Sequence, residues 1–149
     1  MTALTKNRNT PSRGTVRAVR GYPLGAAARA FAGGIAVLNA AGFAVPATTA
    51  TARIALGRFA AEVDNSAGAN GAASVEVERG VFRFDNSADA DLITLADVGK
   101  RCYLVDDQTV AKTGAVVESA ATRSVAGYVD DVDDQGVWVL LDPTSGASA

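Results

Sequence analysis

The side chains best suited to chemistry in this sequence are carboxylates that gather near its C-terminal end. Four residues hold positions one, three, six and twelve of a calcium-binding loop: Asp131, Asp133, Gly136 and Asp142. The match fails at position five, which is Gln135, and at position twelve, where an aspartate replaces the bidentate glutamate. Residues 137–141 also have the apolar pattern of a strand instead of a helix. A polar hairpin turn with Gly136 at positive φ is therefore the preferred interpretation.

Other catalytic chemistry lacks the residue types that it needs. The chain contains no histidine, which excludes a Ser-His-Asp triad, an imidazole base and a histidine metal ligand. Cys102 is the only cysteine and its apolar neighbours indicate a buried strand residue. Adjacent carboxylates such as Asp106 and Asp107 point to opposite faces of a strand and do not converge. We therefore expect no enzyme activity, no cofactor and no metal site.

Charge is divided unevenly along the chain. Residues 1–60 carry eight basic and no acidic residues, whereas residues 61–149 carry six basic and sixteen acidic ones, so that the formal net charge is −2. Such asymmetry indicates a basic arm that reaches an anionic partner, or two halves that neutralise each other in an assembly; scattered surface charge is the equally weighted alternative. The residues assigned to partner binding by the arm are Lys6, Arg8, Arg13, Arg17 and Arg20.

Nucleic-acid binding is an alternative that the pattern disfavours. Two sets of residues combine cations with aromatic rings, as a base-stacking surface does: Arg17, Arg20 and Tyr22, and Arg79, Phe82, Arg83 and Phe84. However, the pI is near 5.0, and a nucleic-acid-binding domain is normally basic as a whole. The alternation of Phe82 and Phe84 with Arg83 is also typical of aromatic rings that face a core. We expect Phe82, Phe84 and Trp138 to be core-packing residues.

Short apolar runs separated by turn residues predict an all-β fold, a small antiparallel β-barrel or β-sandwich with an extended N-terminal arm. Strands are expected within residues 35–38, 43–45, 53–63, 74–78, 81–84, 101–105, 110–117, 125–132 and 137–141. The predicted organisation is an extended basic arm at 1–32, a β-domain at 33–142 and a flexible tail at 143–149. Residues 39–42 supply the turn of a hairpin between the strands at 35–38 and 43–45. Residues 26–32 are compatible with one helical turn that Gly33 and Gly34 would end. Residues 94–100 are compatible with another, capped by Thr94 with Asp97 three residues later.

No targeting or membrane segment is evident. The first 25 residues lack the apolar core of a secretory signal. Residues 30–52 are uncharged but contain Gly33, Gly34, Asn39 and Pro46 and few large aliphatic residues. The prediction is a protein made in the cytoplasm that does not bind a membrane.

Several turn and strand segments together resemble one family. They are residues 1–11 (MTALTKNRNTP), 34–42 (GIAVLNAAG), 63–66 (VDNS), 79–82 (RGVF), 97–100 (DVGK) and 106–110 (DDQTV). In these segments the chain resembles the capsid decoration proteins, also called cement or head-stabilising proteins, of tailed bacteriophages and prophages. The similarity covers nearly the whole chain, and its motifs are structural rather than catalytic.

The resemblance implies a non-enzymatic virion protein on the outer surface of the capsid, where it would clamp adjacent major capsid subunits. Its partners would be the major capsid protein and further copies of the chain, with a trimer favoured over a dimer. Deletion of residues 1–15 is expected to leave the β-domain folded and to weaken capsid attachment. A tail or fibre accessory module, also structural, is the other alternative.

Overall fold

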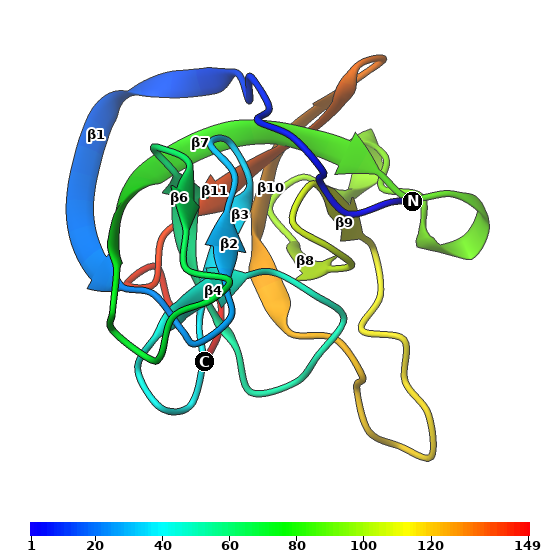
Figure 1. Cartoon of the computed structure of the whole chain (residues 1–149). Coiled ribbons are helices and arrows are strands. Elements are labelled where there is room, and N and C mark those ends of the chain that lie inside the picture. The colour runs from blue at the N-terminus through cyan, green and yellow to red at the C-terminus, as the bar shows by residue number, and fades with distance from the viewer.

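The computed structural model describes the backbone of residues 1–149 and every side chain except those of residues 14–17. The described elements are β1 (Ser12–Pro23), β2 (Arg29–Ala30), β3 (Ile35–Leu38), β4 (Ala44–Pro46), β5 (Ile54–Phe59), β6 (Val63–Asp64), β7 (Ser74–Asn86), η1 (Asp89–Asp91), η2 (Leu95–Asp97), β8 (Arg101–Leu104), β9 (Thr109–Ala111), β10 (Val125–Asp133) and β11 (Gly136–Leu141). The two η elements are single turns of 3-10 helix. The prediction of an all-β fold is therefore confirmed (Figure 1).

Five strands form a closed barrel. They follow the order β11-β10-β8-β9-β7, and β7 pairs back with β11 to close the ring. The strand β7 is 13 residues long and curves over the top of the molecule in Figure 1. We expected two strands here, at 74–78 and 81–84, and this was wrong. Gly80, at φ 150°, lies inside one continuous strand, so the glycine permits a local distortion without ending the pairing.

The first half of β7 carries a second group of strands. β5 pairs with it, β3 pairs with β5, and β4 pairs with β3. The β3–β4 hairpin was predicted, and its turn shows why. The Asn39 Oδ1 accepts hydrogen bonds from the backbone amides of Ala41 and Phe43, at 3.0 Å each, and Gly42 takes φ 87°. β2 and β6 form a separate two-stranded ribbon.

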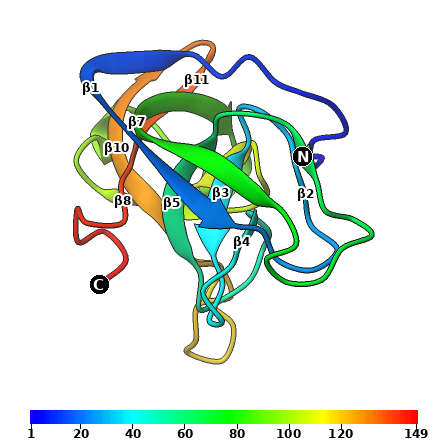
Figure 2. The same cartoon turned by 60° about the vertical axis from the view of Figure 1, so that its left-hand side comes forward.

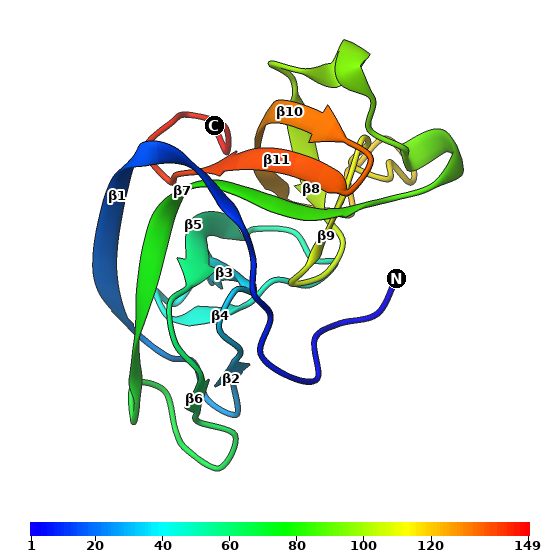
Figure 3. The same ribbon diagram turned by 90° about the horizontal axis from the view of Figure 1, so that it is seen from above.

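The strand β1 runs along the outside of β7 (Figures 2 and 3). Ala18–Pro23 pair with Ser74–Arg79 of β7, and Leu24, directly after β1, is fully buried. Residue 32, the expected boundary between an arm and a β-domain, is not a break in the described structure, because residues 18–23 pair with β7 and Leu24, Ala28 and Ala30 are buried. The helical turn expected at 26–32 is wrong, since this stretch contains β2.

The C-terminal residues fold back onto the domain. Ala147 is buried, and the Ser145 hydroxyl donates a hydrogen bond of 2.9 Å to the Asp142 carbonyl oxygen. Residues 143–149, expected to form a flexible tail, thus make internal contacts in this structure.

The interior contains two apolar clusters. The barrel cluster includes Phe82 and Phe84, which are 1% and 0% exposed, and the second cluster lies under β1, β2 and the first half of β7. Burial of one such phenylalanine stabilises the fold by about 1.5–3 kcal/mol. Trp138 is also buried, but it lies outside both clusters, beneath the guanidinium group of Arg13 at 4.2 Å from its ring.

Candidate interaction surfaces

Residues 1–11, which we call the strap, lie across the turn between β8 and β9. The backbone amide of Leu4 donates to the Asp107 carboxylate at 3.0 Å, and the Gln108 side-chain amide donates to the Thr2 carbonyl oxygen. The strap therefore docks mainly through polar groups. Such groups exchange for water or for another partner at little net cost, because a typical internal hydrogen bond contributes about 1 kcal/mol.

Arg8 anchors the middle of the strap. Its guanidinium group donates to the Gln108 side chain at 3.1 Å, pairs with the Asp85 carboxylate at 3.3 Å and lies 5.8 Å from the centre of the Phe84 ring. The side chain is only 16% exposed. A residue assigned to partner binding from the sequence is thus engaged inside the molecule in this conformation.

Gly33 and Gly34 provide the space for the strap. A methyl group on Gly33, whose φ is 87°, would lie 2.1 Å from the Arg8 carbonyl oxygen. One on Gly34 would lie 3.3 Å from the Leu4 side chain and 3.4 Å from the Asp107 carboxylate. These glycines are needed for close approach of two chain segments and do not end a helix.

The other basic residues assigned to the arm have different surroundings. Lys6 is exposed, and Arg20 is exposed with its guanidinium group donating to the Val19 carbonyl oxygen at 3.0 Å. Arg13 pairs with Asp131 and stacks on Trp138. The side chain of Arg17 lies outside the described residues. Lys6 and Arg20 are therefore the assigned cations that an anionic partner reaches without breaking an ion pair shown here.

One carboxylate under the strap, that of Asp107, has a shifted pKa. Burial is the main reason why the pKa of Asp107 is raised above its ordinary value, and the neighbouring Asp106 raises it further. The Leu4 amide opposes this shift by donating to the charged form. Asp106 itself accepts a hydrogen bond of 2.9 Å from the Gln108 amide. Each carboxylate thus has a structural role in the turn that supports the strap.

The calcium-loop alternative has no support in the geometry. Asp133 accepts hydrogen bonds from the Gly136 amide at 3.1 Å and from the Trp138 indole at 2.8 Å, within the β10–β11 hairpin turn. Asp131 is paired with Arg13, and Asp142 accepts hydrogen bonds from Thr144. No cluster of three potential ligands occurs among the side chains that the structure describes.

The cysteine and two of the aromatic rings considered for chemistry are buried. Cys102 is fully buried, and burial raises the pKa of its thiol to about 12, so the thiolate is not accessible at neutral pH. Of the rings of the nucleic-acid alternative, Phe82 and Phe84 are buried and cannot stack on bases, whereas Tyr22 is half-buried. The described surface also has a cleft of about 340 Å³, which is lined in part by Arg53, Tyr103 and Arg123 and is open to solvent.

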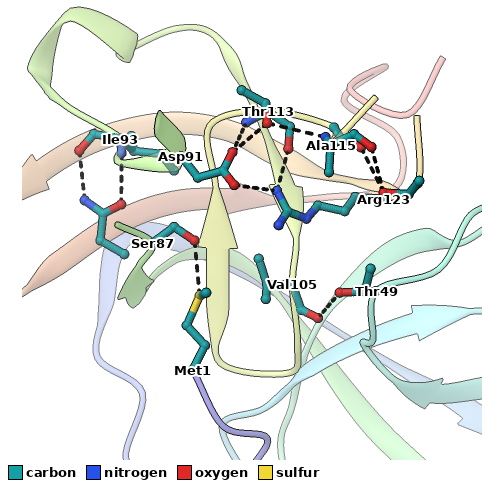
Figure 4. Close-up of polar contacts among 12 residues, drawn as sticks. Met1, Thr49, Ser87, Asp91, Ile93, Val105, Thr113, Ala115 and Arg123 are labelled. Atoms are coloured by element: carbon teal, nitrogen blue, oxygen red, sulfur yellow. Dashed lines mark hydrogen bonds and ion pairs between the residues drawn. The ribbon is translucent and has the colours of Figure 1, made fainter. Parts of the chain in front are cut away.

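A second feature was not recognised in the sequence. It is a pair of segments, residues 89–98 and 112–123, that are joined at their bases and that we call the platform. Asp91 joins the two segments: its carboxylate accepts hydrogen bonds from the Thr113 hydroxyl at 2.5 Å and from the Arg123 guanidinium at 3.0 Å (Figure 4). Arg123 also donates to the Thr113 carbonyl oxygen at 3.1 Å. Asp91 is separated from Thr113 by 22 positions and from Arg123 by 32, and no local sequence pattern predicts contacts over such separations.

The N-terminal end of the strap lies beside the base of the platform. The Ser87 hydroxyl lies 3.3 Å from the Met1 sulfur, and the neighbouring Asn86 side chain binds both the amide and the carbonyl of Ile93, at 2.9 and 2.8 Å (Figure 4). Asn86 thereby fixes the start of the first platform segment.

The chain matches no known family model, no curated protein and no solved structure. Among the residues that the structure describes, no helix has the length and apolar character needed to cross a membrane.

Proposed function

We propose that this chain is a structural virion protein that binds the outer surface of a phage or prophage capsid and stabilises the shell by clamping adjacent major capsid subunits. The observation that carries the proposal is the strap. It is a basic, extended segment held to the domain by polar contacts that a partner's groups are able to replace. The resemblance to decoration proteins supplies the nature of that partner.

The charge distribution supports this assignment. The first 60 residues contain only basic charged groups, and Lys6 and Arg20 lie exposed on this part of the chain. A field of one sign attracts an acidic surface and orients the chain before contact. Each contact is weak, but many copies bound to neighbouring shell subunits would hold the shell through multivalency.

The chemistry found in the fold agrees with a structural role. The carboxylates in turns accept internal hydrogen bonds, as at Asp106, Asp107 and Asp133. Buried apolar side chains fill the interior of the barrel. These features stabilise a scaffold that presents its surface to other proteins.

The test is quantitative mass spectrometry of purified particles from the phage or prophage that encodes the chain. A copy number near that of the major capsid protein is the expected result. A few copies per particle would move the protein to the tail or a vertex, and absence from particles would contradict the proposal.

A further inference from the structure

The first nine residues of the strap contact the domain in the way a bound peptide does. Seven of their side chains are exposed, and only those of Leu4 and Arg8 are partly covered. Thr10 differs, because it is buried and its hydroxyl donates to the Gly33 carbonyl oxygen. Residues 1–9 are therefore held by two side chains four positions apart, whereas the residues from Thr10 onward belong to the fold.

Main-chain groups of the strap make the next set of contacts. The Arg8 amide donates to the Ala32 carbonyl oxygen at 2.9 Å, and the Leu4 amide donates to the Asp107 carboxylate at 3.0 Å. Any extended segment offers such amides, and in peptide recognition main-chain hydrogen bonds supply affinity while side-chain contacts supply specificity. The residues that contact the strap form what we call the strap site: 32–34, 83–85, 107 and 108.

The strap site holds one guanidinium group with several acceptors. That of Arg8 donates to the Gln108 side chain at 3.1 Å and to the Arg83 carbonyl oxygen at 3.3 Å, and it lies 3.3 Å from the Asp85 carboxylate. These acceptors come from β7 and from the turn between β8 and β9. Acceptors in several fixed directions match the planar guanidinium fork and not the compact ammonium of a lysine. The strap site therefore selects arginine at this position.

The second covered side chain and the charge of the site complete its selectivity. Leu4 lies over Gly34, where an added methyl group would be 3.3 Å from the leucine side chain. Asp85 and Asp107 make the strap site acidic, and residues 61–149 carry sixteen acidic and six basic residues. An extended basic segment with a leucine and an arginine four positions later fits both the contacts and the charge.

We propose that the strap site is a binding site for an extended basic segment of another protein, and that the strap is its intramolecular ligand. In the free chain the short connection keeps the strap at a high effective concentration, so the strap excludes other peptides. A partner that draws the strap away frees the site for such a segment. In this respect alone the inference rests on the proposed function, which gives the strap a partner.

The experiment adds a synthetic peptide of residues 1–9 to the full chain labelled with ¹⁵N, without capsids. Nuclear magnetic resonance follows the backbone amides of Ala32, Asp107 and Gln108. Arg8→Ala in the chain removes the main anchor of its own strap, and this variant is expected to bind the added peptide saturably. The wild-type chain should bind the peptide at least tenfold more weakly, because its own strap competes. Lys6→Ala is the matched control and should behave as the wild type, since Lys6 is exposed.

Changes in the peptide test the selectivity of the site in the Arg8→Ala chain. A peptide with Arg8→Lys keeps the charge and loses the fork, and it should bind about tenfold more weakly. A peptide with Lys6→Ala loses a charge of the same sign and should bind within about twofold of the original peptide. Equal binding of the Arg8→Lys peptide would overturn the selection of arginine and with it the proposal.

Two further results would overturn the proposal. One is the lack of a saturable shift in the Arg8→Ala chain, and the other is equal binding of the peptide by the wild-type chain. Leu4→Ala replaces Arg8→Ala if circular dichroism shows that the latter is unfolded. Unfolding of both variants would show that residues 1–9 are part of the fold and not a ligand. Because no capsid is present, failure here counts against the strap site alone, whereas absence from particles counts against the proposed function.

Discussion

The strap and the platform are two surfaces of one small fold, and they differ in how they are held. The strap is basic and docks through hydrogen bonds and one ion pair at Arg8, over glycines that leave room for it. The platform is a pair of segments joined at their bases by Asp91, and each segment carries exposed apolar side chains and left-handed residues. Polar contacts suit a segment that changes partners.

The largest expected loss of stability concerns Trp138 of β11, whose ring stacks under the guanidinium group of Arg13 at the start of β1. Trp138→Ala should lower the free energy of unfolding by about 3–5 kcal/mol, because it removes a buried ring and leaves two cations without their aromatic support. Trp138→Phe keeps a ring and loses the hydrogen bond to Asp133, with a cost of about 1–2 kcal/mol. Urea denaturation measures both. A loss below about 1 kcal/mol for Trp138→Ala would place this ring outside the stabilising interior.

A substitution at Gly33 tests whether the strap needs close approach. Gly33→Ala should destabilise the fold by about 2–4 kcal/mol, because it adds both backbone strain and a clash with the Arg8 carbonyl oxygen. Gly42→Ala is the matched control: its φ is also 87°, but a methyl group there meets no atom within 4 Å. Its cost should be only about 1 kcal/mol. Equal costs would show that the strap does not press on Gly33.

The Gly33 variant should also release the strap. Trypsin is expected to cleave after Lys6 and Arg8 faster in Gly33→Ala than in Gly42→Ala, because Arg8 is shielded only while the strap is docked. Unchanged cleavage at Arg8 would contradict the role assigned to this glycine.

A third prediction concerns the acid sensitivity of the platform. The pKa of Asp91 is lowered from its ordinary 3.8, first by the Thr113 hydroxyl and also by Arg123. The stabilisation by this carboxylate is therefore fully present above pH 3.8 and is lost as the pH falls through the lower pKa of the folded state. The protection factors of the amides in residues 112–123, taken relative to the intrinsic exchange rate at each pH, should fall in that acidic range. In Asp91→Asn these protection factors should already be low at neutral pH and should depend less on acid.

The smallest effect on stability is expected at the exposed cations. Lys6→Gln and Arg20→Gln should each change the free energy of unfolding by less than about 0.5 kcal/mol, since neither forms an ion pair in the described structure. Both should weaken capsid attachment, and more so at low salt, where charge attraction is strongest. Thermal unfolding and capsid co-sedimentation measure the two effects separately. Unchanged attachment of the double variant would remove these cations from the proposed contact.

Local patterns predicted what is local in this fold. The Asn39 turn, the Gly136 turn and the Thr94–Asp97 capping box were all expected, because each depends on residues a few positions apart. The continuity of β7 through Gly80 was missed, since strand pairing with β11 overrides the preference of one glycine. The docking of the strap on Asp107 and the closure of the platform by Asp91 were missed because both join distant segments. The capsid partner was inferred from resemblance and remains a prediction.

The most direct test of the account is co-sedimentation with capsids from the encoding phage or prophage, comparing the full chain with a variant that lacks residues 1–9. This deletion replaces the longer one at 1–15 because Thr10 is buried and Ser12 and Arg13 pair with β7. We predict that the truncated chain keeps the circular dichroism spectrum of the full chain and loses at least tenfold in capsid occupancy. Full occupancy by a folded truncated chain would contradict the claim that the strap attaches this protein to its shell.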